Sequence, residues 1–289
     1  MDGSDNDALA RSQILSLTPN TQFSRRGFAI TSLGVGFALA AQPIHAQTVI
    51  HTSDTGLDAG EVKVKTADGL MPAYRAKPKG KTFPPVVLVI HEIFGVHEHI
   101  QDLCRRLAKA GYYAIAPDLF ARAGDATKVT DTPTLMSTIV SKTPDDQAMG
   151  DLDAAVAFAK SEKANVKRLG VAGFCWGGRR TWLYVERNPN VLAGAAWYGP
   201  LHPDAPIQGA AKVKGRIIGF YGGKDAGIGP DQIAEMRKAL SDAGDTETRI
   251  IVYPDAPHGF NADYRPSYTK SAATEAWQNM LAWFQGHGV

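Results

Sequence analysis

Hydrophobic residues beyond position 61 fall into two alternating patterns along the chain. Short continuous apolar runs, such as 86–91 and 112–116, are typical of strands that are buried on both faces. Longer stretches with an apolar residue every three or four positions, such as 145–160, are typical of helices that cover a sheet. The predicted strands are 61–66, 71–76, 86–91, 112–116, 166–174, 192–198, 216–221 and 248–253. The predicted helices are 100–110, 145–160, 177–187, 231–243 and 271–285.

The alternation of strands with helices, without an internal repeat, predicts a single α/β domain over residues 47–289. Asp68-Gly69 is a turn that joins the first two strands as a hairpin. The other strands are expected to form a mostly parallel, doubly wound sheet with helices on both faces. Residues 121–142 lack a clear period and are predicted to be a loop or lid over the functional site.

The most distinctive motif in the chain is Gly173-Phe174-Cys175-Trp176-Gly177-Gly178. It lies between a predicted strand and a predicted helix, and it has the pattern of a nucleophile elbow with cysteine where serine is usual. Side chains at Gly173 or Gly177 would collide with the neighbouring chain, and the helix N-terminus favours a thiolate at Cys175. The N–H of Trp176 is then placed to donate to an oxyanion. The alternative is a glycine-rich structural turn with a buried cysteine.

Two further residues follow this motif in the order that α/β-hydrolases use, which is nucleophile, acid and histidine. Asp225 comes just after the strand predicted at 216–221, at the edge where parallel sheets place ligands. His258 lies in a glycine-containing loop after the strand predicted at 248–253. In such a triad the carboxylate fixes the histidine tautomer and stabilises the imidazolium. Taken singly, Asp225 is also consistent with a turn cap, and His258 with a loop histidine bonded to a carbonyl.

Glu92 directly follows the buried strand predicted at 86–91. A carboxylate at the end of a buried strand is unfavourable unless it is bonded, and a carboxylate beside a cysteine can hold or accept the thiol proton. Such control would limit oxidation of Cys175 while no substrate is bound. The N–H of Ile93 is the expected second oxyanion donor. Glu92 is equally consistent with a helix cap or with a partner for a nearby arginine.

Five motifs in this order resemble the dienelactone hydrolase (carboxymethylenebutenolidase) family, from about position 61 to the carboxyl end. The motifs are Glu92-Ile93-Phe94-Gly95, Pro117-Asp118-Leu119-Phe120-Ala121-Arg122, Gly173-Phe174-Cys175-Trp176-Gly177-Gly178, Gly223-Lys224-Asp225 and His258-Gly259-Phe260. The resemblance implies the α/β-hydrolase fold and a catalytic triad of Cys175, Asp225 and His258. It also implies that Glu92 receives the thiol proton when substrate enters.

The same resemblance implies that Arg122 binds a substrate carboxylate, to which a guanidinium can make two parallel hydrogen bonds. The family carries a second arginine four positions after the catalytic histidine, where this chain has Ala262. Arg265 is a candidate to supply that charge from a shifted position. The expected reaction is hydrolysis of a small, carboxylate-bearing lactone or ester through an acyl-enzyme on Cys175. The alternatives are a broader carboxylesterase or thioesterase, or a non-catalytic or thiol-redox protein on the same scaffold.

Composition and short motifs argue against several other classes of protein and site. Of the 289 residues, 44% are hydrophobic and 21% are charged, which suits a globular domain, and a net charge of +2 gives no argument for nucleic-acid binding. Two cysteines, Cys104 and Cys175, are too few for a disulfide scaffold, and Cys104 is expected to be a buried hydrophobe. His91, His97 and His99 do not form an H-E-x-x-H motif, and no phosphate loop follows the first strand. Neither a metal nor a cofactor is therefore expected.

The amino-terminal segment has the parts of an export signal. The sequence S-R-R-G-F at 24–28 precedes an uncharged stretch at 29–41 that is too short to span a bilayer. This combination resembles a twin-arginine signal, with cleavage expected near Ala46. It predicts a signal peptide over 1–46, recognition by the twin-arginine export machinery, and a periplasmic mature protein without a stable membrane span. The alternative is an amphipathic or disordered arm that stays attached.

Overall fold

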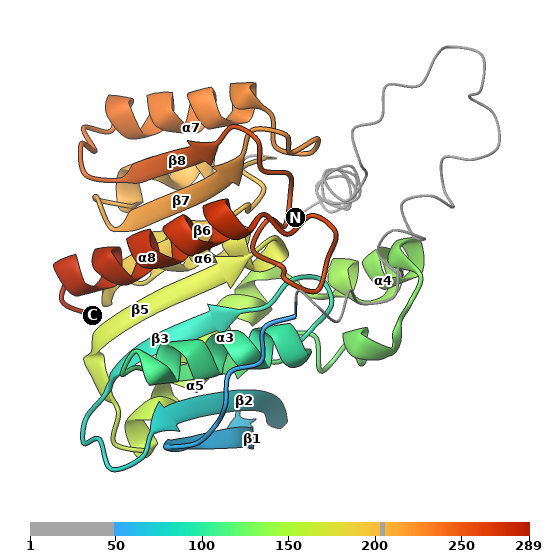
Figure 1. Ribbon diagram of the computed structural model, residues 1–289, viewed down its shortest axis with the longest axis vertical. Coiled ribbons are helices and arrows are strands. Elements are labelled where there is room, and N and C mark those ends of the chain that lie inside the picture. Colours follow the sequence, from blue (N-terminus) through green and yellow to red (C-terminus); the bar gives the residue numbers. More distant parts are fainter. Residues whose placement is uncertain (1–48, 203–205) are drawn as a thin grey trace.

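Eight strands form one sheet in this computed structural model, which describes residues 49–202 and 206–289 (Figure 1). The strands are β1 (Leu57–Lys65), β2 (Leu70–Pro78), β3 (Pro85–Ile90), β4 (Tyr113–Pro117), β5 (Asn165–Phe174), β6 (Val191–Trp197), β7 (Ile217–Gly222) and β8 (Arg249–Tyr253). The longer helices are α3 (Glu98–Lys109), α5 (Asp145–Ser161), α6 (Trp176–Arg187), α7 (Pro230–Asp242) and α8 (Lys270–Gly286). The predicted alternation of strands and helices is confirmed, although the first strand begins earlier than expected.

The sheet has the strand order β1-β2-β4-β3-β5-β6-β7-β8. β2 is antiparallel to both β1 and β4, and every neighbouring pair from β4 to β8 is parallel. The predicted hairpin turn is closed by the Thr66 N–H, which donates to the Gly69 carbonyl at 2.9 Å. Because β3, β5, β6, β7 and β8 run parallel, their carboxyl ends meet at one edge of the sheet. The residues that follow these strands form the candidate site.

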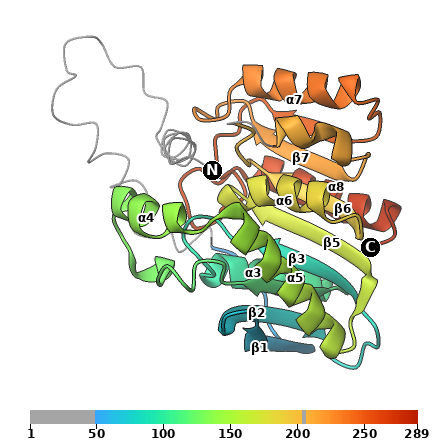
Figure 2. The same cartoon turned by 180° about the vertical axis from the view of Figure 1, so that it is seen from behind.

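Helices cover both faces of the sheet, and each face has its own hydrophobic core (Figures 1 and 2). α3 and α8 pack over one core, and α5, α6 and α7 pack over the other. In β3, Val87 and Val89 belong to the core beneath α3, whereas Leu88 and Ile90 belong to the core beneath α5 and α6. Two-sided burial explains why this strand reads as an unbroken apolar run.

The segment 121–142, predicted as a loop or lid, contains short helical elements. They are η1 (Ala126–Lys128), α4 (Thr132–Thr138) and η2 (Val140–Lys142). Asp131 caps α4, since its carboxylate accepts a hydrogen bond from the Thr134 N–H at 2.8 Å. Leu135 and Ile139 are buried in the core that α5 and α6 cover. Packing therefore anchors this segment to the domain.

The predicted export signal over residues 1–46 lies outside the described residues. The sheet begins at Leu57, after the cleavage site expected near Ala46. Within the described ranges, no helix is both long and apolar enough to cross a membrane.

Candidate active site

Cys175 lies in a sharp turn between β5 and α6, at the carboxyl edge of the sheet. Its backbone has φ 54° and ψ −117°, which is strained for a residue with a side chain. The Cys175 N–H donates to the Trp197 carbonyl, and the Gly178 N–H donates to the Cys175 carbonyl, both at 2.9 Å. Only 1% of Cys175 is exposed. The turn has the strained, tightly held geometry expected of a nucleophile elbow.

Glycines make this turn possible by allowing close backbone contacts. A Cβ on Gly173 would lie 2.1 Å from the Gly177 carbonyl oxygen. A Cβ on Gly177 would lie 2.3 Å from the carbonyl oxygen of Ile90, the last residue of β3. No larger residue fits at either position without moving the backbone. The second contact also brings the residues that follow β3, among them Glu92, next to the elbow.

Asp225 and His258 form a buried pair, with 2.7 Å between Oδ2 and Nδ1. The other carboxylate oxygen, Oδ1, accepts hydrogen bonds from the N–H groups of Gly227 and Ile228 at 2.9 and 3.1 Å. Asp225 therefore caps the turn after β7 with one oxygen and orients His258 with the other. Because the carboxylate accepts a hydrogen from Nδ1, the ring presents Nε2 to the remaining neighbours.

The charge state of His258 is set by opposing effects. Burial lowers its pKa, but the charges of Asp225 and Cys175, together with the hydrogen bond to Asp225, outweigh burial and raise the pKa to about 10. Nε2 makes no hydrogen bond of good geometry with any described residue. Since Nδ1 is engaged by Asp225, Nε2 is the nitrogen that can take a proton from Cys175.

Glu92 is fully buried at the end of β3. Its Oε2 accepts a hydrogen bond from the Tyr264 hydroxyl at 2.6 Å and lies 3.9 Å from His97 Nε2, which is too long for a hydrogen bond. Its Oε1 is buried and has no hydrogen-bond partner among the described residues. Burial raises the pKa of Glu92, but the contact with His97 and the charge of Arg265 outweigh it and lower the pKa to about 2. Glu92 is therefore a carboxylate at neutral pH.

The amides predicted to form an oxyanion hole come from two loops that meet at the elbow. Trp176 is the first residue of α6, where N–H groups lack a partner inside the helix. Ile93 lies in the loop that follows β3, and the backbone of His91, two residues earlier in that loop, lies next to Gly177 of the elbow. Among the described residues, neither N–H donates to a turn or loop carbonyl. Donation to an oxyanion stays a prediction for both amides.

Arg265 extends from the loop after β8 into the same group of residues. Its guanidinium lies 5.7 Å from the centroid of the Phe94 ring. Burial lowers its pKa, but the neighbouring Tyr264 and Glu92 raise it overall, so the side chain stays charged. Its Nη1 is buried without a hydrogen-bond partner in the part of the chain that is described. A buried charged donor of this kind is suited to an anionic group of a ligand.

Arg122 forms ion pairs with carboxylates outside the group of residues around Cys175. Its Nη1 and Nη2 donate to the two carboxylate oxygens of Asp151 at 2.7 and 3.0 Å, and its Nε donates to Asp68 at 2.6 Å. It lines a hollow together with Thr66 and Met71. Two carboxylates therefore occupy the guanidinium, and its described contacts do not include Cys175. The substrate-binding role that the resemblance implies for Arg122 stays a prediction without structural support.

Three residues of the site, Tyr198, Tyr264 and His97, were not predicted as site residues from the sequence. Tyr198 follows β6 with φ 38°, and its ring meets the His258 ring edge-on, with 5.1 Å between centroids. Its buried hydroxyl has no hydrogen-bond partner among the described residues. The position after a buried parallel strand is a signal that could have identified Tyr198. No such signal connects Tyr264 to Glu92, because 172 positions separate them.

His91 and Trp176 form part of the surroundings of the elbow. Their rings are parallel within 5°, with 5.5 Å between centroids. His91 Nδ1 lies 2.6 Å from the Glu92 carbonyl oxygen, and its Nε2 accepts a hydrogen bond from the Leu119 N–H at 3.1 Å. These contacts select one neutral tautomer, and burial lowers the pKa of His91 to about 4. His91 is therefore a neutral packing group at physiological pH.

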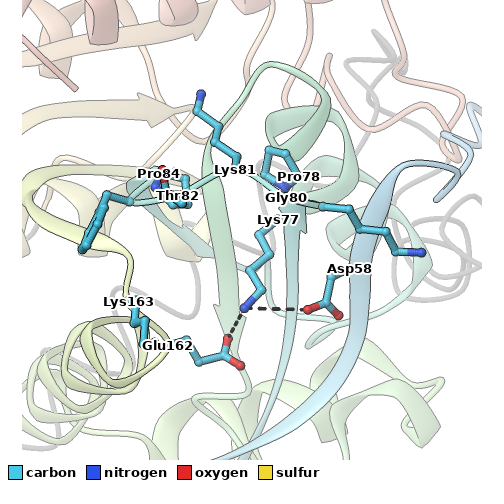
Figure 3. A pocket seen from close by; sticks show the side chains of 11 residues that line it. Asp58, Lys77, Pro78, Gly80, Lys81, Thr82, Pro84, Glu162 and Lys163 are labelled. Carbon is cyan, nitrogen blue, oxygen red and sulfur yellow. Dashed lines mark ion pairs between the residues drawn. The ribbon is translucent and has the colours of Figure 1, made fainter.

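A separate pocket of about 320 Å³ lies near the amino end of β3, opposite the edge that carries Cys175 (Figure 3). Lys77 Nζ lies there between Asp58 and Glu162, at 3.7 and 3.5 Å from their carboxylate oxygens. Arg75 also pairs with both acids, at 2.7 and 2.9 Å. The acidic groups of this pocket are therefore neutralised by cations of the chain itself.

Two other clusters bear on the metal and redox alternatives. In the described part of the chain, His51, Glu98 and Asp102 form the single group with metal-ligand spacing. Arg105 donates to both Glu98 and Asp102, so its guanidinium already pairs with both carboxylates. Cys104 is a free, buried cysteine in α3, and burial raises the pKa of its thiol, which makes it a poor redox partner.

Comparison with known proteins connects this geometry to a family. The Dienelactone hydrolase family, represented by its sequence model, matches residues 71–288. A "Putative carboxymethylenebutenolidase" from Methylorubrum extorquens is 53% identical over 283 residues, covering 95% of this chain and 97% of the relative. A protein of the same name from Escherichia coli (strain K12) is 48% identical, covering 88% of this chain and 96% of the relative. The crystal structure of a "Putative Dienelactone Hydrolase" from Klebsiella pneumoniae is 47% identical with a TM-score of 0.77, covering 79% of this chain and 98% of that one. This chain therefore belongs to the dienelactone hydrolase family and is a hydrolase with the α/β-hydrolase fold.

Proposed function

We propose that this protein hydrolyses small esters or lactones that carry a carboxylate, with Cys175 as the nucleophile. The observation that carries the proposal is the buried Asp225–His258 pair, with 2.7 Å between Oδ2 and Nδ1. The charge of Cys175, in its strained turn, contributes to the raised pKa of this histidine. Family membership supports ester or lactone chemistry, since the relatives are named for a lactone hydrolase. Nη1 of Arg265 is buried and has no hydrogen-bond partner within the described ranges, which supports a carboxylate on the substrate.

The first half-reaction forms an acyl-enzyme. The Cys175 thiol proton passes to Nε2 of His258, giving a thiolate and an imidazolium that Asp225 stabilises. The thiolate attacks the carbonyl carbon, and the carbonyl electron pair moves to the oxygen, which accepts hydrogen bonds from the amides of Ile93 and Trp176. Collapse of this intermediate breaks the bond to the leaving oxygen, which takes the proton from His258. The product is a thioester on Cys175.

The second half-reaction returns the free enzyme. Water attacks the thioester carbonyl while His258 accepts one of its protons. Collapse then breaks the carbon–sulfur bond and releases the acid, and the departing sulfur of Cys175 takes the proton from His258, which restores the thiol and the neutral imidazole. With a lactone substrate, the alcohol and the acid remain in one molecule, so a single hydroxy acid leaves the site.

Substrate selection is assigned to Arg265. This chain has the buried Ala262 where the family carries its second arginine, so a methyl group replaces a charge there. The guanidinium of Arg265 lies against the Phe94 ring and keeps Nη1 without a partner among the described residues. Arg122 is already engaged by two carboxylates, which makes Arg265 the better-supported partner for a substrate carboxylate.

A substrate panel tests the proposal directly. Purified protein is assayed with cis-dienelactone, with carboxylate-bearing esters and with neutral p-nitrophenyl acetate. We expect hydrolysis that Cys175→Ala abolishes and that the matched variant Cys104→Ala leaves unchanged. Equal efficiency on charged and neutral substrates would favour the broader carboxylesterase. Absence of hydrolysis across the panel would refute the proposal, and loss of activity in Cys104→Ser would favour the redox alternative.

We also propose that the protein is exported by the twin-arginine route to the periplasm, on the basis of the sequence motif at 24–28. Replacing Arg25 and Arg26 together by lysine is expected to retain the full-length precursor in the cytoplasm. Cell fractionation followed by immunoblotting measures this, and Arg11→Lys is the matched control for the loss of an arginine. Continued export of the double variant would contradict the proposed route.

A further inference from the structure

Arg180 is an almost fully buried arginine in α6, with 2% of its surface exposed. It follows Trp176 by four positions, so both side chains lie on the same face of the helix. The guanidinium carbon lies 3.9 Å from the centroid of the Trp176 ring, in the geometry of a cation–π interaction. Burial lowers the pKa of Arg180 to about 10, which leaves it charged at neutral pH. A buried charge is unfavourable unless neighbouring groups compensate it, so the groups around Arg180 must do so.

The anion that compensates this charge is Asp145, the first residue of α5. Its Oδ1 lies 2.7 Å from Nη2 of Arg180. α5 and α6 lie side by side on one face of the sheet (Figure 2), so the ion pair joins the start of α5 to the helix of the elbow. Nε and Nη1 of Arg180 are buried and have no hydrogen-bond partner among the residues that the structure describes. Within this part of the chain, one carboxylate and the Trp176 ring hold the guanidinium.

Ring contacts, and not a hydrogen bond, hold the indole of Trp176. Its Nε1 is buried and has no hydrogen-bond partner in the described part of the chain. The His91 ring lies 5.5 Å from the indole and the Phe120 ring lies 4.7 Å from it, measured between centroids. Arg180 adds a charged group to these two uncharged rings. Its removal therefore changes how the indole is held.

The position of the indole affects the backbone of Trp176, to which the ring is joined through a single side-chain carbon. Trp176 is the first residue of α6, where N–H groups have no acceptor inside the helix. This N–H is one of the two amides proposed above to bind the oxyanion. Its placement is critical, because a misplacement of about 1 Å in an active site can reduce the rate by about 100-fold.

We propose that Arg180 is a positioning residue: its guanidinium, held by Asp145, fixes the Trp176 indole and so keeps the Trp176 N–H directed at the oxyanion. The inference rests on the proposed function, in which this amide stabilises the intermediate of both half-reactions. Arg180 acts through Trp176 and does not contact the substrate. When an interaction made only with the oxyanion is weakened, kcat and kcat/KM fall together and KM stays the same.

Steady-state kinetics with p-nitrophenyl acetate test the proposal. Arg180→Met keeps an unbranched apolar side chain but removes the charge beside the indole. We expect kcat to fall by about tenfold, less than the loss of about 100-fold or more for a deleted oxyanion donor, because the amide is displaced and not removed. KM should change by less than about twofold, since both half-reactions are slowed alike. Arg180→Lys returns a cation to the ring, so kcat should recover to within about threefold of wild type.

Tyr184→Phe is the matched control at the same pair of helices. The Tyr184 hydroxyl joins α6 to α5 by donating to Asp153 at 2.9 Å, a contact that does not involve Trp176. Its loss should reduce stability towards urea and leave kcat unchanged. A merely structural role of Arg180 would give this same pattern in Arg180→Met, which would contradict the proposal.

Trp176→Leu determines whether Arg180 acts through the indole, since this variant keeps the backbone N–H. In a double-mutant cycle, Arg180→Met should have little further effect on kcat once the indole is replaced. A change confined to KM in Arg180→Met, or an undiminished effect of that substitution in the Trp176→Leu background, would overturn the proposal.

If Arg180→Met does not fold, Asp145→Asn provides the test at the half-buried partner. It should lower kcat by about threefold, as for loss of one partly exposed ion pair, and leave KM unchanged. Wild-type kcat in Asp145→Asn would then overturn the proposal. These outcomes are distinct from failure of the proposed function, which would appear as absence of ester hydrolysis by the wild-type protein.

Discussion

His258 is surrounded by two groups that favour its protonated form. Oδ2 of Asp225 lies 2.7 Å from Nδ1, and the charge of Cys175 also raises the pKa of the ring. Because these groups raise the pKa of His258 to about 10, the ring is a strong acceptor for the thiol proton of Cys175. The proton that His258 takes from the thiol can then be donated to the leaving oxygen.

Replacing Asp225 by asparagine should show how far proton transfer through His258 depends on the carboxylate charge. Asp225→Asn removes the anion that raises the pKa of His258, so kcat/KM should fall by about 10³-fold or more at neutral pH. The measurement is kcat/KM against pH. Asp231→Asn, at an exposed position in the first turn of α7, is the matched control and should leave the profile unchanged. A wild-type profile in Asp225→Asn would contradict the assigned role.

Substitutions of Arg265 and Arg122 are expected to have different effects on the hydrolysis of charged substrates. Arg265→Ala should lower kcat/KM for a carboxylate-bearing ester by about 10- to 100-fold, since a charged hydrogen bond is lost, and should barely affect a neutral ester. Arg122→Ala should reduce stability instead, because Arg122 pairs with Asp68 and Asp151. The measurement compares both variants on matched charged and neutral esters. Equal losses on both substrates in Arg265→Ala would contradict the carboxylate assignment.

Spacing predicted the residues of the elbow and of the Asp225–His258 pair, because each follows a strand that is recognisable in the sequence. The anchoring of Glu92 was not predictable. Its contact with Tyr264 joins two loops that are 172 positions apart, and no local pattern encodes such a pairing. The engagement of Arg122 by Asp151 was missed for the same reason, since a motif gives a residue type and not its partners.

At the scale of elements, the elbow depends on how closely β5, α6 and β3 approach each other. Gly173→Ala would place a Cβ 2.1 Å from a backbone oxygen that cannot move independently. We expect the free energy of unfolding to fall by about 3 kcal/mol or more. Gly150→Ala, in α5, is the matched control: its Cβ would have no atom within 4 Å, and the change should be stabilising by up to about 1 kcal/mol. Urea unfolding measures both, and equal effects would contradict the packing argument.

Buried strands were the elements that the sequence predicted best. Each carries a continuous apolar run because both of its faces are covered, as in β3 and β7, where every residue is buried. The short helix α4 was missed because seven residues are too few to display a helical period. Its burial of Leu135 and Met136 becomes evident only when the segment is packed against the sheet.

At the scale of the whole molecule, the site lies where the direction of winding reverses. From β3 the chain moves to one side, to β4, and then returns to add β5 and the later strands on the other side. Glu92 follows β3, and Cys175 lies directly after β5, so both flank this switch point, where open α/β sheets bind ligands. The strand order, and with it this adjacency, follows from the packing of the whole sheet and was not readable from the strand sequences alone.

The stability of the whole domain should decline on acidification. The pKa of the fully buried His91 is about 4 in the folded protein, against an ordinary 6.5, so between these values the unfolded chain binds a proton that the folded chain does not. Stability is therefore retained above about pH 6.5 and falls, by on the order of 3 kcal/mol from this group, as the pH drops towards 4. Urea unfolding at several pH values measures this decline. His91→Gln should flatten it, and a free energy of unfolding that rises on acidification would contradict the assignment.

The central claim is that Cys175 carries the acyl group during turnover. The most direct test is rapid quenching of the reaction with p-nitrophenyl acetate, followed by mass spectrometry of the digested protein. An acetyl group should appear on the peptide that contains Cys175, decay at the rate of turnover, and be absent in a folded Cys175→Ala variant. Full turnover in that variant, or acetylation confined to another residue, would contradict the account.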